Sequence, residues 1–111
     1  MTTTKSGLQY EVLKAGTGKA SPKATDTISA HYHGTLIDGT VFDSSVERGE
    51  PLEIPVGGVI AGWTEALQLM KAGDKWKIHL PSKLAYGPEG SPPKIAPNSA
   101  LVFEIELIEI K

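Results

Sequence analysis

The stretch GVIAGWTEALQLMKAG, residues 58–73, carries the one strong helix signal in this chain. Its apolar residues recur at i, i+3, i+4 and i+7, which is the spacing of one helix face: Trp63, Ala66, Leu67 and Met70. Gly73 follows this face and predicts a C-terminal cap. A helix of about three turns is marginal in water on its own, so we expect it to pack against other structure.

Alternating apolar and polar residues predict β-strands on both sides of this helix. The alternation covers residues 8–12, 27–36, 41–42, 52–56, 75–80 and 101–111. Asp38-Gly39 predicts a hairpin turn, Pro55 an edge strand or a bulge, and a slip of phase at Ile108 a bulge or a strand end. Together these elements predict the α+β class, with an antiparallel sheet of five to six strands packed on one short α-helix.

Polar and proline-rich segments interrupt this alternation. Residues 1–6 predict a disordered N-terminal tail, which leaves residues 7–111 as one domain. The polar segment from Asp43 to Gly49 predicts an excursion or a bulge after the strand that contains Phe42. The segment from Pro81 to Ala100 holds five of the eight prolines, and long ordered loops are often binding loops.

The composition is that of an ordinary globular domain of 111 residues. A net charge of −2 gives no electrostatic reason to expect binding to nucleic acid or to an anionic membrane. The absence of cysteine excludes disulfides, thiolate catalysis and cysteine-ligated zinc. The N-terminus has no apolar signal segment, so we expect a cytoplasmic protein if the chain is complete as given. The alternative is a periplasmic or outer-membrane-associated protein from which a signal and an N-terminal domain were removed.

Few side chains suggest covalent or metal chemistry. His31 and His33 share one strand face and His79 lies on another strand, so three histidines could hold zinc, although exposed histidines are more often only solvated. No serine lies in a nucleophile motif, and GGVIAG lacks the Lys-Ser/Thr of a phosphate-binding loop. Paired carboxylates for glycoside hydrolysis stay open, although most acids occupy outward strand positions. We therefore expect neither a cofactor nor a metal.

Aromatic residues form the remaining signal, and they come from separate elements: Tyr32, Phe42, Trp63, Tyr86 and Phe103. Their ordinary role would be to fill the core. The functional alternative is an aromatic-lined pocket at the seam between sheet and helix. In that case its few polar groups would be the hydroxyl of Tyr86 and the carboxylate of Asp43.

Four motifs connect this chain to a known family: HYHGTLIDGTVFDSS at residues 31–45, GVIAGWTEAL at 58–67, LAYGPEG at 84–90 and APNSALVFEIEL at 96–107. In these motifs the chain resembles the FKBP-type peptidyl-prolyl isomerases, the macrolide-binding immunophilins. The motifs follow the family's order over almost the whole chain. They are most similar to the bacterial branch that resembles the macrophage infectivity potentiator. Members of that branch usually carry an N-terminal helical dimerisation domain, which is absent here, so we expect a monomer.

The resemblance implies a twisted antiparallel half-barrel around one short helix, with a ligand cavity between them. It implies that six residues do the catalytic work: Tyr32, Phe42, Asp43, Trp63, Tyr86 and Phe103. It adds five residues to the surface that binds substrate: Arg48, Leu52, Val59, Ile60 and Ile95. In such a cavity the tryptophan would be the floor under the prolyl ring, and the other aromatic rings would be its walls.

Contacts with macrolides are implied in the same way. The backbone N–H of Ile60 and the hydroxyl of Tyr86 would donate hydrogen bonds to ligand carbonyls. The carboxylate of Asp43 would face the ligand, braced by Arg48. Leu52 stands where the family commonly has an aromatic residue, which makes one wall of the cavity less aromatic.

The resemblance implies a peptidyl-prolyl cis-trans isomerase that acts on Xaa-Pro bonds in peptides and in unfolded or folding proteins, and that macrolides such as rapamycin inhibit. Amide resonance opposes this rotation with a barrier of about 18–20 kcal/mol. The twisted amide is less polar than either planar form, so a dry apolar cavity favours it without a nucleophile or a metal. The alternative is a binding module that holds proline-containing segments with little catalysis.

Overall fold

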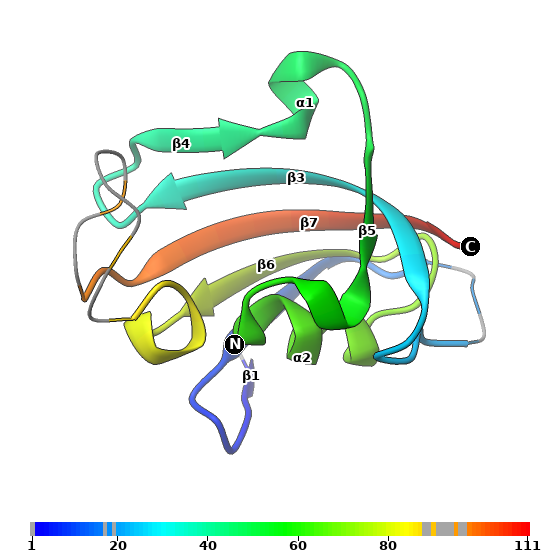
Figure 1. The fold of residues 1–111 in the computed structure, drawn as a ribbon, viewed down its shortest axis with the longest axis horizontal. Coiled ribbons are helices and arrows are strands. Elements are labelled where there is room, and N and C mark those ends of the chain that lie inside the picture. Colours follow the sequence, from blue (N-terminus) through cyan, green and yellow to red (C-terminus); the bar gives the residue numbers. More distant parts are fainter. Residues whose placement is uncertain (1, 17, 19, 88–89, 91–94, 96–97) are drawn as a thin grey trace.

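The computed structural model describes residues 2–16, 18, 20–87, 90, 95 and 98–111, without the side chains of residues 47 and 48. Within these residues seven strands form one antiparallel sheet (Figure 1): β1 (Thr2–Thr3), β2 (Gln9–Lys14), β3 (Thr27–Leu36), β4 (Val41–Ser44), β5 (Leu52–Pro55), β6 (Lys75–Leu80) and β7 (Leu101–Ile110). The helices are α1 (Ser45–Arg48) and α2 (Ala61–Leu69), with short 3₁₀ helices η1 (Val56–Gly58) and η2 (Ser82–Leu84). The predicted α+β class is therefore confirmed.

The two longest strands, β3 and β7, form the centre of the sheet, whose order is β1-β2-β6-β7-β3-β4. Their antiparallel ladder runs from the pair Ile28–Ile110 to the pair Leu36–Leu101. The register shifts once, at Ile108, which is left without a partner residue on β3. A slip of phase in the sequence predicts a bulge at this residue, and the ladder confirms it.

Two shorter strands share the outer edge of β3. β4 pairs with the C-terminal half of β3, and β5 pairs with its N-terminal half, where Pro55 lies opposite Thr27. Figure 1 shows β5 at a steep angle to β4, with α1 between them. Pro55 thus lies on an edge strand, as its residue type predicts, because an edge tolerates a residue without a backbone N–H.

Helix α2 packs on one face of the curved sheet (Figure 1). The helix face that the sequence predicts to be buried is buried: Trp63, Ala66, Leu67 and Met70. A Cβ atom added at Gly62 would lie 2.3 Å from a methyl carbon of Leu80. The helix therefore approaches β6 more closely than any residue with a side chain would allow.

The core lies between α2 and the inward-facing residues of the central strands. Alternation along β7 buries four of these residues: Leu101, Phe103, Ile105 and Leu107. Burial of a side chain of this size stabilises the fold by about 1.5–3 kcal/mol. The core is continuous with the aromatic residues that the sequence assigns either to a core or to a pocket.

The first residues differ from the disordered tail that the sequence predicts over residues 1–6. Thr2 and Thr3 form β1, which pairs with β2, and Thr4 N–H donates to the carbonyl of Leu8 at 2.8 Å. The hydroxyl of Ser6 donates to the carboxylate of Glu65 on α2. Leu8 is fully buried, so the hairpin is attached to the core by a side chain and to the helix by a hydrogen bond.

In the polar segment after Phe42, where the sequence predicts an excursion or a bulge, Asp43 and Ser44 continue β4 and Ser45–Arg48 form α1. Gly49 ends this helix with φ +79° and donates its N–H to the carbonyl of Ser45 at 3.0 Å. The described part of the long segment from Pro81 to Ala100 contains η2 and Tyr86. None of the helices in the described residues has both the length and the apolar character that a membrane span requires.

Candidate active site

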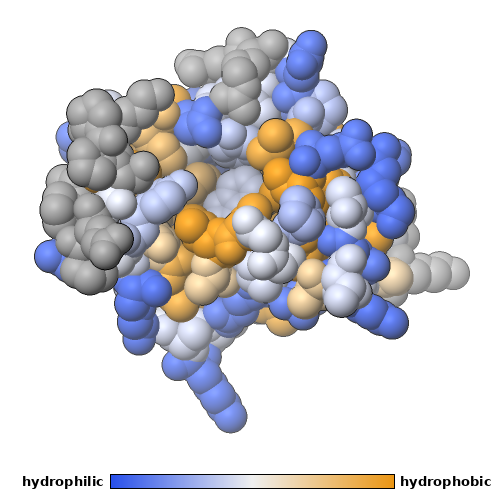
Figure 2. Space-filling view, viewed as in Figure 1, coloured by the Kyte–Doolittle hydropathy of each residue, from blue (hydrophilic) through white to orange (hydrophobic). Residues whose placement is uncertain are grey.

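A cavity of about 470 Å³ opens where α2 meets β3 and β4. Figure 2 shows this side of the molecule hollowed near its middle, with apolar residues around the hollow. The cavity is lined by Tyr32, Phe42, Asp43, Leu52, Ile54, Gly58, Val59, Ile60, Trp63, Tyr86 and Phe103. Because these residues come from four strands, from α2 and from two connecting segments, the cavity exists only in the folded chain.

Trp63 forms the floor of this cavity, in the first turn of α2. Its ring lies edge-to-face with Tyr32 (centroids 5.2 Å apart) and with Phe103 (5.2 Å), and Phe103 lies edge-to-face with Phe42 (5.4 Å). The indole N–H of Trp63 has no hydrogen-bond acceptor among the described residues, so neighbouring rings hold the indole in place. Edge-to-face pairs of this kind add to the stability that burial alone supplies.

These aromatic residues are both core and pocket. Trp63 is only 5% exposed and Phe103 only 3%, and both belong to the continuous hydrophobic core. The sequence offers core and pocket as alternatives, whereas the structure shows one face of each ring packed and another face lining the cavity. Tyr86 differs, because it is 39% exposed and lies at the mouth.

Gly34 on β3 makes room for this packing, and the sequence analysis does not identify it. A Cβ atom there would lie 2.7 Å from Cζ of Phe42 and 2.8 Å from Cε1 of Phe103. The two rings can therefore meet only because this position has no side chain. A glycine inside a strand is a signal of such close approach, and here the signal is the motif HYHGTL.

Two polar side chains of the cavity, a tyrosine and a carboxylate, form a hydrogen-bonded pair. The hydroxyl of Tyr32 donates to Oδ2 of Asp43 at 2.5 Å. Tyr32 lies on β3 and Asp43 on β4, and the register of these strands brings the two residues to neighbouring positions. A charge-assisted hydrogen bond of this kind fixes both side chains.

One wall of the cavity is held by a residue that the sequence analysis does not name. The hydroxyl of Thr64 donates to the carbonyl of Val56 at 2.7 Å and lies 3.5 Å from the carbonyl of Val59. The carbonyl of Ile60 accepts the backbone N–H groups of Trp63 and Thr64. The segment that contributes Val59 and Ile60 is therefore attached to the same helix turn that carries the floor.

The structure brings most of the predicted site residues together. All six of the predicted catalytic residues line the cavity, as do Leu52, Val59 and Ile60. Ile95 is 3% exposed and belongs to the core, and its predicted contact with substrate stays a prediction. The side chain of Arg48 lies outside the described part, and its bracing of Asp43 stays a prediction. Ile54 and Gly58 line the cavity although the sequence analysis does not include them.

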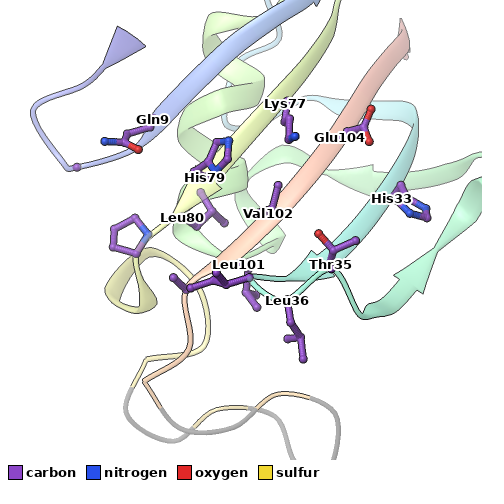
Figure 3. A pocket seen from close by; sticks show the side chains of 15 residues that line it. Gln9, His33, Thr35, Leu36, Lys77, His79, Leu80, Leu101, Val102 and Glu104 are labelled. Carbon is purple, nitrogen blue, oxygen red and sulfur yellow. The ribbon is translucent and has the colours of Figure 1, made fainter. Parts of the chain in front are cut away.

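The opposite face of the sheet carries a larger hollow, of about 720 Å³. Figure 3 shows side chains of mixed charge along it, among them Lys77, His79 and Glu104. Burial lowers the pKa of His79, and the Lys77 cation lowers it further. This hollow has no aromatic wall, so we assign the active site to the smaller aromatic cavity. Zinc at the three histidines is also unsupported, because the described residues contain no cluster of three or more metal-ligating side chains.

A curved antiparallel sheet wrapped on one helix, with an aromatic cavity at their seam, defines a class of α+β domains in which a cavity opens between sheet and helix. The chain belongs to the FKBP-type peptidyl-prolyl cis-trans isomerase family, whose model matches residues 18–108. It is 59% identical over 107 residues to the FKBP-type 22 kDa peptidyl-prolyl cis-trans isomerase of Escherichia coli K12, covering 96% of this chain and 52% of that relative. The outer membrane protein MIP of Legionella longbeachae is 54% identical, with 96% and 45% covered.

Solved structures agree with this assignment. FkpA from Escherichia coli superposes with a TM-score of 0.93 at 52% identity, covering 99% of this chain and 51% of that one. A peptidyl-prolyl cis-trans isomerase from Pseudomonas syringae superposes with a TM-score of 0.89 at 42% identity, covering 96% and 77%. This chain thus spans about half the length of the curated relatives named above.

Proposed function

We propose that this chain catalyses cis–trans rotation about Xaa-Pro bonds in peptides and in unfolded or folding proteins. The observation that carries the proposal is the aromatic cavity of about 470 Å³ with Trp63 as its floor. Rotation makes and breaks no bond, so the cavity must only bind the twisted amide more tightly than either planar form. The twisted amide is less polar, and a cavity walled by Tyr32, Phe42 and Phe103 favours it.

Each part of the cavity has a proposed role. The prolyl ring rests on Trp63, and the backbone N–H of Ile60 together with the hydroxyl of Tyr86 orients the carbonyl groups of the substrate. The Tyr32–Asp43 pair supplies the only charge that we assign to the chemistry, and it transfers no proton. Macrolides such as rapamycin would occupy the same cavity and compete with the peptide.

The test is cis–trans exchange of a short Leu-Pro peptide, measured by NMR with and without rapamycin. We expect accelerated exchange that rapamycin abolishes. Exchange that is not accelerated, together with rapamycin-induced shifts at the Trp63 indole, would leave a binding module for proline-containing segments as the function. Acceleration that rapamycin does not affect would contradict macrolide inhibition and leave the isomerase proposal standing.

We also propose a monomer that acts outside the cytoplasm. One relative at 54% identity carries the name outer membrane protein, which favours the periplasmic or outer-membrane-associated alternative over the cytoplasmic expectation. Sedimentation of the 111-residue chain would measure its mass, and fractionation of cells that express the natural gene would locate the protein. A dimer, or recovery in the cytosolic fraction alone, would contradict these two statements.

A further inference from the structure

Two buried serines at the junction of β4 and α1 connect the cavity with the outer face of the sheet. Ser45 is fully buried, and its Oγ accepts the backbone N–H of Tyr32 at 2.8 Å. The same Oγ lies 3.0 Å from Nδ1 of His31 and 3.3 Å from the carbonyl oxygen of Tyr32. Ser44 makes a similar arrangement: its Oγ lies 2.9 Å from Nδ1 of His33 and 3.5 Å from the same carbonyl oxygen.

Ser45 lies where the edge of β3 loses its strand partners. The ladder between β3 and β4 ends at the pair His33–Ser44, and the ladder between β3 and β5 reaches only to Ala30. Tyr32 lies between them, and its N–H and C=O point toward the serine hydroxyl instead of toward a strand. A side-chain hydroxyl therefore replaces the missing ladder at the residue whose phenol binds Asp43 in the cavity.

The hydroxyl of Ser45 has one hydrogen and two acceptors within reach. Its oxygen already accepts from Tyr32 N–H, so the hydrogen goes either to Nδ1 of His31 or to the carbonyl of Tyr32. A neutral imidazole with its proton on Nε2 accepts at Nδ1. A doubly protonated imidazole donates at Nδ1, and the Ser45 hydrogen must then turn to the carbonyl of Tyr32.

Charged groups from two further strands face His31 on the outer face. A recess of about 340 Å³ contains His31 and His33 together with Lys75 from β6 and Glu104 and Glu106 from β7, with Val46 from α1 at its side. Glu106 is the direct cross-strand partner of His31. The recess is open to water, so protons reach this imidazole from the face opposite the cavity.

We propose that Ser45 is a positioning residue for the Tyr32–Asp43 pair and that the protonation of His31 decides which way its hydroxyl points. With His31 neutral and its proton on Nε2, Ser45 holds Tyr32 by its N–H alone. With His31 doubly protonated, Ser45 holds both the N–H and the C=O of Tyr32. The wall of the cavity is then fixed more tightly in acid, through a contact that touches no substrate.

The first test is kinetic and rests on the proposed isomerase activity. The substrate is an acetylated and amidated Leu-Pro peptide, which has no titrating group of its own. We expect S45A to lower kcat/KM about five- to tenfold, as loss of one buried hydrogen bond would. I78V, a core substitution far from the junction, controls for lost stability. A folded S45A variant with the kcat/KM of the wild type would overturn the proposal.

The pH profile separates positioning from a merely structural role. We expect kcat/KM of the wild type to rise about twofold when His31 takes up its second proton. In H31F the profile should be flat. H79F is the matched control, since His79 lies two strands away from β3 on the same face, and it should keep the wild-type profile. An H31F profile equal to that of the wild type would refute the role of His31.

A second measurement needs no activity at all. The amide proton of Tyr32 should shift with pH in the wild type, with the midpoint of the His31 ring nitrogens, and should lose this shift in H31F. If the chemical shift of the Tyr32 amide proton does not change with pH, or changes equally in H31F, the proposed hydrogen-bond network is contradicted. If the wild type shows no isomerase activity, the proposed function fails while this measurement still decides the network.

Discussion

Gly34 is the residue whose replacement should act most directly on the shape of the cavity. In G34A a methyl group would have to share space with Phe42 and Phe103, which lie 2.7 and 2.8 Å from its position. Overpacking of this kind costs about 1–3 kcal/mol, and it displaces two walls of the cavity. We expect kcat/KM to fall about tenfold, measured by exchange of the Leu-Pro peptide.

A30G is the control for Gly34, because it changes the same strand and removes a methyl group where G34A adds one. If a folded G34A variant isomerises the peptide as fast as the wild type, the two rings have room that the structure does not show. A30G should lose stability through its buried methyl group and keep its kcat/KM.

Substitution of Phe42 should lower kcat/KM, whereas substitution of Tyr86 should weaken the binding of rapamycin. F42A removes a wall that packs edge-to-face against Phe103, so we expect a loss of at least tenfold in kcat/KM. Y86F removes only a hydroxyl at the exposed mouth, and we expect rapamycin to bind about threefold more weakly. Titration of rapamycin against Trp63 fluorescence measures the second effect. Full activity in folded F42A would remove this residue from the site.

His79 makes stability depend on pH. Burial and the Lys77 cation lower its pKa in the folded protein, against a weaker opposite effect of Glu11, whereas the unfolded chain binds a proton below about pH 6.5. The unfolded state then holds more protons, so stability should fall as pH drops from 7.5 to 5.5. Urea unfolding at both pH values should show a smaller fall in H79Q. Equal falls of the free energy of unfolding in the wild type and in H79Q would contradict this role of His79.

At the scale of elements, α2 and the segment before it form one unit. The hydroxyl of Thr64 attaches the carbonyl of Val56 to the helix, and Val59 and Ile60 line the cavity beside it. In T64V the shape stays and the donor is lost, which costs about 1 kcal/mol. We expect KM for the peptide to rise about threefold with kcat nearly unchanged, because in the proposed function Ile60 of this segment orients the substrate.

T64S tests whether the hydroxyl is the cause, since it restores the donor without the methyl group. It should return KM to the wild-type value. A T64V variant with unaltered KM, or a T64S variant as impaired as T64V, would mean that packing alone holds this segment. Peptide titration of the three proteins at one temperature makes the comparison.

Elements whose signal is local are the ones that the sequence predicts well. The face of α2, the bulge at Ile108 and the edge position of Pro55 each follow from neighbouring residues and are confirmed. β1 is different: it pairs locally with β2, but Thr2 and Thr3 show no alternation of apolar and polar residues, so the sequence does not predict this strand.

The residues of the candidate site also divide into those that the sequence predicts and those that it does not. Periodicity alone identifies the aromatic residues without deciding between core and pocket, and the resemblance to a family adds Leu52, Val59 and Ile60. Neither periodicity nor the resemblance identifies Gly34 and Thr64. The role of Gly34 lies in its missing side chain, and that of Thr64 in a hydrogen bond to a backbone carbonyl. Such roles are visible only when the distances between elements are known.

At the scale of the whole molecule, cavity and core share the same aromatic rings, so ligand binding and folding must be coupled. A ligand that binds only the folded state raises the free energy of unfolding by about 2.7 kcal/mol at one hundred times its Kd. We expect rapamycin at that concentration to move the midpoint of urea unfolding accordingly. F42A should show a smaller shift than the wild type. Equal midpoints with and without rapamycin would contradict binding at this cavity.

The position of β7 has a consequence for synthesis of the protein. This strand follows the other described strands in sequence order, yet it lies between β6 and β3 at the centre of the sheet. Until residues 101–110 have left the ribosome, the neighbours on both sides lack their partner and expose apolar surface. Chains are made from the N-terminus at about 5–20 residues per second, so the sheet cannot close before β7 is available. A chain truncated before residue 101 would therefore leave the edges of β3 and β6 exposed and would be a substrate for chaperones and proteases.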